Sequence, residues 1–508
     1  MTKQNNYRID KNSEAEFTNN MDYCIGTGRM DLAMQKEYLD ELKLVQKEIG
    51  FKHIRGHGLF CDQMAIYQEY SDLEGNTKAE YNFTYLDRVM DSYRELGLKP
   101  FIELGFMPSK LASGKQTVFY WKGNTTPPSD YEKWCDQVIA TIQHFIDRYG
   151  LEAALSFPIE VWNEPNLPGF WENADMEEYF KLFEVTFKAI KNFNSKFRVG
   201  GPAVCGGTDE KWIRAFCEFC DSKDLDIDFI TRHHYNTDFP VNEGHYGYAK
   251  LTEPKKGYEN LHTTREIADS FDRFKEIEIH ITEFNTSYIP NCCIHDTNQN
   301  AAYLADQLSN LGNENESYSY WTFGDVFEEN GVPFTPFHGG FGLVANGCIP
   351  KPTFWTFAFY KKLIGKCVLH DENIIVVKGD DGAYRGISWN LDISDRTTSE
   401  IGILLDTDFG DSKVSLVIKT VDEQKCNPLK LWHDLGEPSS LNANQLELLR
   451  QEARPFINSE TLTAVDGEID LKLWLESNAV VYFELSKIKT ASDRGFDYER
   501  TTVRIQSK

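Results

Sequence analysis

The sequence predicts an α/β fold, a (β/α)8 TIM barrel with an appended β-sandwich, from three observations. Up to about residue 360, eight short hydrophobic strand candidates alternate with amphipathic helical stretches. Two of these strands end in a glutamate, Glu164 and Glu283. From about residue 366 the pattern changes to short strands and turns. A chain of 508 residues exceeds the roughly 250 residues that a barrel typically needs, which leaves room for a second domain.

The barrel prediction depends on a regular order of strands and helices. The expected strands are 22–26, 52–57, 100–105, 158–163, 197–203, 228–234, 277–283 and 318–323. The expected helices are 33–48, 79–96, 129–148, 176–193, 208–221, 259–275 and 298–311, with a final helix within 350–363. Parallel crossovers are normally helical and right-handed, so eight such units imply a closed barrel. Glu164 then ends the fourth strand and Glu283 the seventh, at the barrel end where active sites form.

The C-terminal third has the pattern of an antiparallel β-domain. A hairpin turn is expected at 379–382, and alternating apolar residues predict a strand at 469–475. A helix at about 441–452 interrupts the strands, and the N-terminal strand around Tyr7 is expected to complete the sandwich. The predicted domains are a catalytic barrel at 15–360, a β-sandwich from 1–14 and 361–486, and a C-terminal extension at 487–508.

Composition excludes several classes of partner. The formal net charge of −26 would repel nucleic acid and anionic membranes, so we expect neither as a partner. No apolar stretch has the length of a signal-peptide core or a membrane span, which predicts a soluble, cytoplasmic protein. Eleven scattered cysteines, an odd number, are typical of free thiols.

Glu164 lies where a hydrophobic strand stops. Ile159 and Val161 suit a strand, while Pro165 and Gly169 prevent its continuation and leave the carboxylate at an open end. A carboxylate in this position is a candidate general acid. The alternative is an acidic residue that caps a later helix.

Glu283 ends a second β-branched strand. Period-2 alternation places Ile277, Ile279 and Ile281 on its side of the strand, so Glu283 is expected to be the polar end of a buried face. The alternative is a solvated glutamate at a strand end. A pair of such carboxylates favours a site over either alternative.

The two glutamate motifs carry a resemblance to a known family. VWNEPN (161–166) and ITEFNTSY (281–288) resemble the catalytic signatures of retaining glycosidases on (β/α)8 barrels, in particular glycoside hydrolase family 39, the β-xylosidases. Further similar stretches are IRGHGLF (54–60), DFITRHHY (228–235) and YWTFGDVFEE (320–329). The resemblance runs from about residue 15 to 360 and continues less distinctively beyond.

This resemblance implies that Glu164 is the acid/base and Glu283 the nucleophile. Retaining enzymes hold their two carboxyl groups about 5 to 5.5 Å apart, which neighbouring strand ends allow. Ionised Glu283 is expected to help Glu164 keep its proton. Arg55 is the candidate that keeps Glu283 ionised, and an ion pair of Arg55 with Glu160 is the alternative.

The resemblance also implies residues that bind the sugar. Asn163 is expected to bind the sugar 2-hydroxyl. Trp321 and Glu328 are expected to supply the floor and a hydroxyl-binding acid. His57, His233 and Tyr235 are expected to line the pocket, with Phe170 and Tyr288 as walls for which ordinary packing is an equal alternative.

No cofactor and no metal are expected. His233 and His234 are sequential in a strand and should point in opposite directions, and His280 and Glu283 should diverge likewise. Glycine pairs such as Gly200-Gly201 lack the nucleotide-binding fingerprint.

The sequence therefore predicts a retaining, exo-acting β-xylosidase that releases xylose from short xylo-oligosaccharides. The alternatives are an α-L-iduronidase, an endo-xylanase or other retaining glycosidase on the same barrel, and a non-catalytic sugar-binding protein. Because enzymes of the resembled family are often oligomers, a homo-oligomer is expected, with a tetramer as one option.

Overall fold

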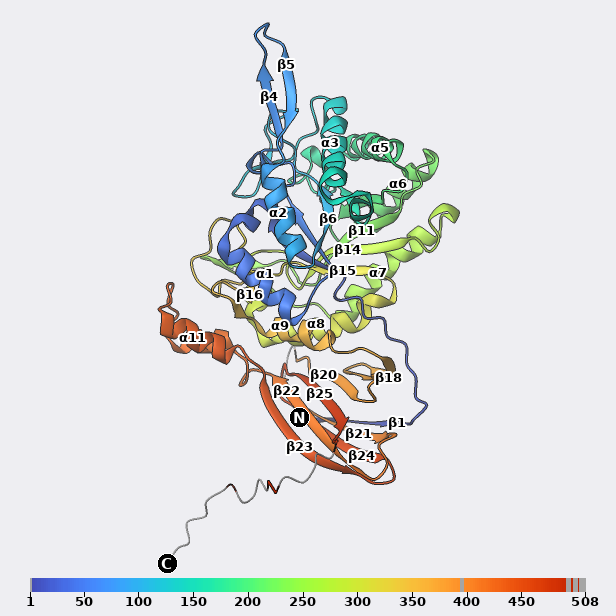
Figure 1. The fold of residues 1–508 in the computed structure, drawn as a ribbon, viewed down its shortest axis with the longest axis vertical. Helices are drawn as coiled ribbons and strands as arrows, with labels where there is room; N and C mark the ends of the chain where they lie inside the picture. Colours follow the sequence, from blue (N-terminus) through green and yellow to red (C-terminus); the bar gives the residue numbers. More distant parts are fainter. Residues whose placement is uncertain (1, 393–396, 490–494, 497–500, 502–508) are drawn as a thin grey trace, which may run out of the picture.

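The computed structural model describes residues 2–392, 397–489, 495, 496 and 501 of the chain. Most of the predicted C-terminal extension, 487–508, lies outside these residues. The predicted domain boundaries stay predictions, while the architecture on either side of them is clear in Figure 1: a large α/β body and a smaller β-domain below it.

Eight parallel strands close into a barrel. They are β2 (Cys24–Arg29), β3 (His53–His57), β6 (Lys99–Leu104), β9 (Ile159–Val161), β10 (Val199–Val204), β11 (Phe229–Tyr235), β14 (Glu278–Asn285) and β15 (Ser317–Tyr320). Each predicted strand overlaps one of them, and the spatial order around the barrel follows the order in the chain. The predicted barrel is confirmed.

Helices cover the outside of the barrel (Figure 1). They are α1 (Lys36–Glu48), α2 (Thr84–Glu95), α3 (Tyr131–Tyr149), α4 (Leu151–Leu155), α5 (Met176–Phe193), α6 (Asp209–Ser222), α7 (Pro254–Asp269), α8 (Asn298–Asn310) and α9 (Pro352–Tyr360). Their apolar stripes face the strands, as in α5, where Tyr179, Phe183 and Ile190 are buried.

Three predicted helix boundaries are wrong, and one of them is the end of the helix predicted at 259–275, because α7 ends at Asp269. The helix predicted from residue 79 begins at 84, because Thr77–Tyr81 forms strand β5 and pairs antiparallel with β4 (Tyr67–Ser71). This hairpin projects from the barrel at the top of Figure 1. The helix predicted from residue 259 begins at Pro254, since a proline suits the first turn, where its missing N–H costs nothing.

The C-terminal domain consists of two sheets, of three and six strands. The smaller sheet has the order β1 (Thr2–Ile9), β21 (Thr398–Asp406) and β24 (Glu468–Leu475). The larger has the order β18 (Lys366–Asp371), β19 (Ile374–Lys378), β20 (Tyr384–Trp389), β25 (Val480–Lys487), β22 (Ser412–Val421) and β23 (Phe456–Ala464). The two sheets share one apolar core, to which the four alternating apolar residues of β24 contribute. The predicted sandwich is confirmed.

Other sequence predictions for this domain also hold. The strand around Tyr7 pairs with β21, and the turn at 379–382 joins β19 to β20. The helix predicted at 441–452 is α11 (Ala443–Glu452), which follows α10 (Pro428–Asp434). Helix α11 begins with a capping box. The Asn442 side chain accepts a hydrogen bond from the Gln445 backbone N–H, and the Gln445 side chain accepts one from the Asn442 backbone N–H.

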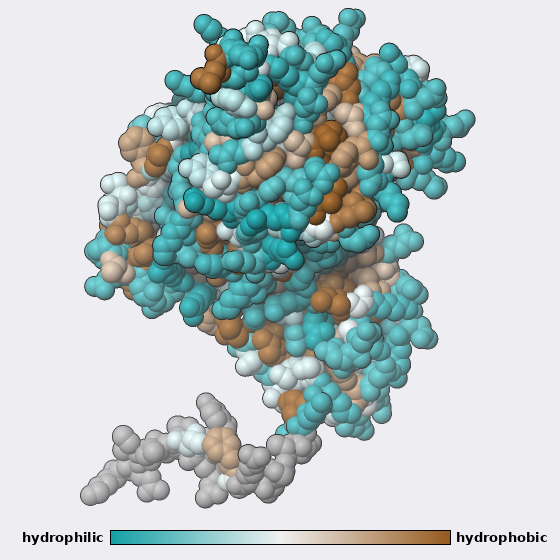
Figure 2. Space-filling view, turned by 45° about the horizontal axis from the view of Figure 1, so that its top comes forward, coloured by the Kyte–Doolittle hydropathy of each residue, from teal (hydrophilic) through white to brown (hydrophobic). Residues whose placement is uncertain are grey.

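Short strands complete the loops of the barrel. They are β7 (Thr117–Val118), β8 (Gly123–Asn124), β12 (Val241–Glu243), β13 (Tyr246–Tyr248), β16 (Val344–Ala345) and β17 (Ile349–Pro350). Hydrophilic side chains dominate the face in Figure 2, with hydrophobic ones in smaller groups among them. None of the described helices has the length and apolar character that crossing a membrane requires.

Candidate active site

Glu164 lies just beyond β9 in a strained turn. Its φ is 45° and that of Trp162 is 74°, values that side chains other than glycine rarely adopt. The Glu164 N–H donates to Ala203 O on β10 at 2.9 Å, which helps to hold the turn. Such strain persists where surrounding structure fixes the backbone, and it is concentrated at functional sites. The carboxyl group ends up at the carboxyl end of the barrel and is almost fully buried.

Glu283 lies beside a bulge in β14. Arg232 pairs with Ile281, but the next residue, His233, pairs with Glu283. The bulge interrupts the alternation of side chains, so Thr282 and Glu283 both contact one buried polar cluster. The expectation that Ile281 and Glu283 share one face is therefore wrong at this point.

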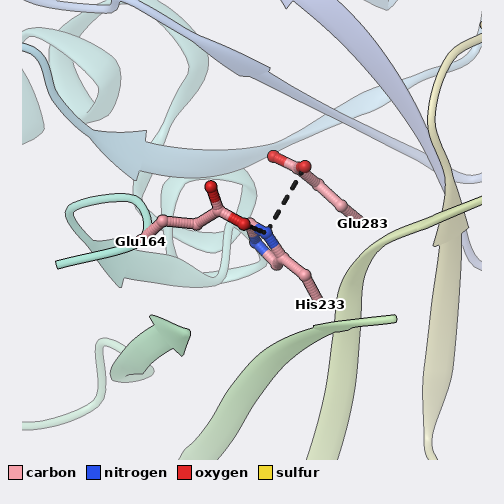
Figure 3. Close-up of side chains that lie close together, drawn as sticks. All are labelled: Glu164, His233 and Glu283. Atoms are coloured by element: carbon pink, nitrogen blue, oxygen red, sulfur yellow. Dashed lines mark hydrogen bonds and ion pairs between the residues drawn. The ribbon is translucent and has the colours of Figure 1, made fainter. Parts of the chain in front are cut away.

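His233 links the two glutamates. Its Nδ1 lies 2.9 Å from Glu164 Oε1 and 3.4 Å from Glu283 Oε2. Figure 3 shows the ring between the two carboxyl groups, with both contacts dashed. One polar atom from each of the three side chains lies within 4.8 Å of the other two. The two carboxylates predicted from separate motifs thus face each other across one histidine.

Glu164, His233 and Glu283 could also be metal ligands. Among the described residues, they form the group whose ligand atoms lie close enough together to bind one metal ion. However, both Glu283 oxygens already accept hydrogen bonds, from Arg55 Nη1 at 2.7 Å and from the Tyr235 hydroxyl at 2.8 Å. The Arg55 guanidinium supplies the positive charge that an ion would bring. The His234 ring bonds Gln307 instead, which confirms that the two sequential histidines point apart.

Arg55 connects the polar groups at the base of the site. Its Nη1 donates to Glu283, its Nε to Glu160 Oε2 at 2.7 Å, and its Nη2 to Asn163 Oδ1 at 2.9 Å. Arg55 therefore forms both predicted contacts, the one with Glu283 and the alternative ion pair with Glu160. Burial disfavours its charge, but Glu160, Glu103 and Glu283 outweigh that effect and raise the pKa of Arg55.

The environment of Glu164 favours its protonated form. Burial raises the pKa of Glu164 to about 7, while the positive charge of Arg55 opposes the shift. The expected cause was the charge of ionised Glu283. In the structure, removal from water is the largest cause. A carboxyl group with a pKa near neutrality can both donate and accept a proton.

A cavity of about 640 Å³ opens over the two glutamates. Of the predicted site residues, those that line it are His57, Asn163, Glu164, Phe170, Tyr235, Glu283, Tyr288 and Trp321. The predicted Arg55 and His233 are fully buried beneath the carboxylates that they contact. Phe119 and Phe341 add aromatic walls that the sequence analysis did not identify.

Glu328 does not line the cavity. Its carboxylate accepts from Arg29 Nη2 at 2.5 Å, and Gln35 lies 3.4 Å away. The neighbouring Glu329 lines the cavity instead, with Oε1 3.9 Å from His57 Nε2. The prediction of Glu328 is therefore off by one residue, because an ion pair with Arg29 at the end of β2 turns that side chain away.

Glu329 is a buried acid at the wall of the cavity. Its burial, followed by the negative charge of Glu283, raises the pKa of Glu329 well above the usual value. The surroundings of Glu329 thus favour its protonated, neutral form. A neutral carboxyl group can donate a hydrogen bond as well as accept one.

A buried lysine supports the loop that carries Phe341. Lys351 Nζ lies 2.6 Å from Asp296 Oδ1 and 2.7 Å from Asp325 Oδ2. These aspartates in turn accept the backbone N–H groups at both ends of loop 339–342. The wall of the cavity therefore rests on a fully buried ion cluster.

Comparison with known proteins agrees with this geometry. A β-xylosidase of Geobacillus stearothermophilus is 45% identical over 95% of both chains, and one of Caldicellulosiruptor saccharolyticus is 34% identical over 84% of this chain and 86% of its own. The crystal structure of a monomeric β-xylosidase from Caulobacter crescentus CB15 superposes with a TM-score of 0.88, at 30% identity, over 96% of this chain and all of that one. The family model for glycosyl hydrolases family 39 matches residues 6–470. The chain therefore belongs to glycosyl hydrolase family 39 and is a glycoside hydrolase.

Proposed function

We propose that this enzyme is a retaining, exo-acting β-xylosidase that releases xylose from the non-reducing ends of short xylo-oligosaccharides. The observation that carries the proposal is the pair Glu164 and Glu283, with carboxylate oxygens within 4.8 Å of each other in one cavity. This spacing is near the roughly 5 to 5.5 Å of retaining glycosidases and well below that of inverting ones. The two similar β-xylosidases support xylose as the sugar.

The proposed reaction has two steps. In the first, Glu164 donates its proton to the glycosidic oxygen while a Glu283 oxygen bonds to the anomeric carbon, so the leaving sugar departs as an alcohol. In the second, Glu164 takes a proton from water, whose oxygen replaces Glu283 at the anomeric carbon. The pKa of about 7 suits Glu164 to both steps.

Neighbouring residues are assigned supporting roles. Arg55 and Tyr235 each donate to one oxygen of Glu283, which orients the nucleophile and keeps it ionised. Arg55 also occupies Oδ1 of Asn163, so the amide NH₂ is left to donate to the sugar 2-hydroxyl. Glu329 takes the hydroxyl-binding role that the sequence analysis gave to its neighbour.

The walls of the cavity suit a small terminal sugar. Aromatic side chains such as Phe119, Phe170 and Trp321 can stack on the apolar faces of a pyranose ring. The expected activity is therefore high on xylobiose and xylotriose and low on polymeric xylan. An endo-xylanase would show the opposite preference.

An α-L-iduronidase is the less favoured alternative. Its substrate carries a carboxylate, which ionised Glu283 would repel. Two cations, Arg232 and Lys256, also line the cavity, but Arg232 is paired with Asp209. The nearby Arg55 already bonds three partners. A neutral sugar suits such a cavity better than an anionic one.

The test replaces each glutamate and adds azide. Glu164→Ala should still form the glycosyl-enzyme from an activated aryl β-D-xyloside and yield β-xylosyl azide. Glu283→Ala should lose turnover and yield α-xylosyl azide, because azide then occupies the place of the nucleophile. Glu177→Ala, an exposed glutamate on α5, is the matched control and should behave as the wild type. Normal turnover by Glu283→Ala would refute the assignment.

The predicted homo-oligomer and cytoplasmic location stay predictions. The similar Caulobacter crescentus enzyme is described as monomeric. Light scattering of the purified protein would give the mass, for which the single chain is 58.5 kDa.

A further inference from the structure

Glu103, at the end of β6, is a buried acid to which neither the sequence analysis nor the proposed mechanism gives a role. It is fully buried, and His57 Nδ1 lies 2.7 Å from its Oε2. His57 lines the cavity, where its other nitrogen, Nε2, lies 3.6 Å from Glu283 Oε1 and 3.9 Å from Glu329 Oε1. His57 thus stands between a hidden carboxyl group and the reacting groups.

Three carboxyl groups surround the Arg55 guanidinium, those of Glu103, Glu160 and Glu283, and their hydrogen bonds distinguish them. Glu160 accepts at both oxygens, from Arg55 and Thr282, and Glu283 likewise accepts at both oxygens. Glu103 Oε1 is buried without any partner. Arg55 Nη2 lies 3.0 Å from the other oxygen, Glu103 Oε2, and also donates a hydrogen bond to Asn163 Oδ1. One guanidinium thus faces three carboxyl groups, and Glu103 is the least supported as an anion.

The surroundings of His57 decide which nitrogen carries hydrogen. Burial lowers the pKa of His57 to about 4, so the ring is neutral, with one donor and one acceptor nitrogen. If Nδ1 were the donor, the Nε2 lone pair would face the oxygen of the nucleophile, Glu283 Oε1, which lies 3.6 Å away. If Nε2 is the donor, the same oxygen attracts its hydrogen. The second tautomer requires Nδ1 to accept a hydrogen bond from Glu103.

We infer that Glu103 is a neutral carboxylic acid that donates a hydrogen bond to His57 Nδ1 and so fixes the tautomer in which Nε2–H points at the nucleophile and the bound sugar. Burial also raises the pKa of Glu103 to about 8, although Arg55 opposes the shift. Glu103 is thus a positioning residue that acts through His57. The expected effect of Glu103 on catalysis rests on the proposed function, whereas the assignment of the His57 tautomer is independent of that function.

Rings on the cavity side help to hold His57 in place. The Trp321 ring lies 4.7 Å from it between centroids, and the Phe119 ring lies 5.8 Å away in a stacked arrangement. The imidazole ring is thus held by Glu103 on one side and by the two aromatic rings on the other, so it cannot rotate to compensate for a change of tautomer. Whether Nε2 carries hydrogen then depends on whether Glu103 donates to Nδ1.

The direct test is 15N NMR of the full-length enzyme labelled at histidine, at pH 6.5 and without substrate. The His57 signals are assigned by comparison with His57→Gln, and their shifts distinguish a protonated from an unprotonated ring nitrogen. We expect hydrogen on Nε2 and none on Nδ1. Hydrogen on Nδ1 would overturn the inference, because Glu103 would then be the acceptor. This result does not depend on which sugar the enzyme cleaves.

Two variants test the consequence for catalysis. Glu103→Gln keeps the size of the side chain and offers an NH₂ donor to Nδ1, so it should keep the tautomer and a kcat/KM within about threefold of the wild type. Glu103→Met has no donor and should lose about 10- to 100-fold, as substitutions of groups that orient a histidine commonly do. Equal losses in both variants would contradict the inference. If neither variant nor the wild type cleaves xylosides while Nε2 carries the hydrogen, the proposed function fails and the inference stands.

Discussion

Replacement of Glu164 by glutamine removes the proton donor and little else. Glutamine has nearly the same size, and its amide can still bond His233, so the strained turn should persist. With a pKa of about 7, roughly nine-tenths of the wild-type enzyme carries the proton at pH 6, against about 3% for a carboxyl group with a pKa of 4.5. Burial therefore increases the acid form about 30-fold at that pH.

The size of the loss depends on the leaving group. General acid catalysis contributes about 10²- to 10⁴-fold, which corresponds to about 3 to 5 kcal/mol of activation free energy. Xylobiose, whose leaving sugar needs a proton, should show this full loss in kcat/KM in Glu164→Gln. A dinitrophenyl β-D-xyloside, whose leaving group departs as an anion, should lose less than about tenfold.

The assay measures kcat/KM for both substrates from pH 4.5 to 9. A carboxyl group whose pKa is raised loses its proton as the pH rises, so wild-type activity on xylobiose should fall above pH 7. This basic limb should be absent in Glu164→Gln with the dinitrophenyl substrate. Glu177→Gln, on the exposed face of α5, serves as the control. Equal losses on both substrates would refute the role of Glu164, as would a basic limb that survives its replacement.

Three further predictions concern other buried groups. Tyr235→Phe removes the donor to Glu283 Oε2 and should lower kcat/KM about 10- to 100-fold at an unchanged melting temperature; a normal kcat/KM would contradict it. Lys351→Met leaves two buried aspartates without their cation and should cost about 3 to 5 kcal/mol in urea unfolding, and a loss below about 1 kcal/mol would argue against the ion cluster. Glu41 on α1 is fully buried, and burial raises its pKa well above the ordinary value of 4.5. Above pH 4.5 the folded protein therefore binds more protons than the unfolded one, so the stability of the wild type falls as the pH rises. The free energy of unfolding of Glu41→Gln, relative to wild type, should then rise by up to about 1.4 kcal/mol for each pH unit above 4.5. A pH-independent difference would contradict this.

The sequence predicted the barrel because its pattern depends on local physics. Each strand is short, hydrophobic and followed by an amphipathic helix, and the chain order alone then fixes which strand ends are neighbours. Glu164 could be identified because it follows a hydrophobic strand beside residues that prevent continuation. Glu283 could be identified because it follows a β-branched run, although β14 continues to Asn285. The helix expected at 79–96 failed at its start because antiparallel pairing with β4 is a tertiary contact.

The finer features of the site depend on contacts that no local pattern encodes. Glu328 and Glu329 are adjacent and chemically identical, and only the ion pair of Glu328 with Arg29 decides which one faces the cavity. The bulge before Glu283 breaks the alternation on which the face assignment depended. Glu103, in the stretch FIELGF, was overlooked, although an acid within a hydrophobic strand is an unusual feature that could have revealed it.

The stereochemistry of the first product tests the central claim most directly. The purified enzyme is mixed with an aryl β-D-xyloside, and 1H NMR follows which anomer of xylose appears before mutarotation. Double displacement through Glu283 and Glu164 predicts β-xylose first, because two inversions restore the configuration. If α-xylose appears first, water attacks directly, and the carboxylates that lie within 4.8 Å of each other cannot have the roles assigned to them.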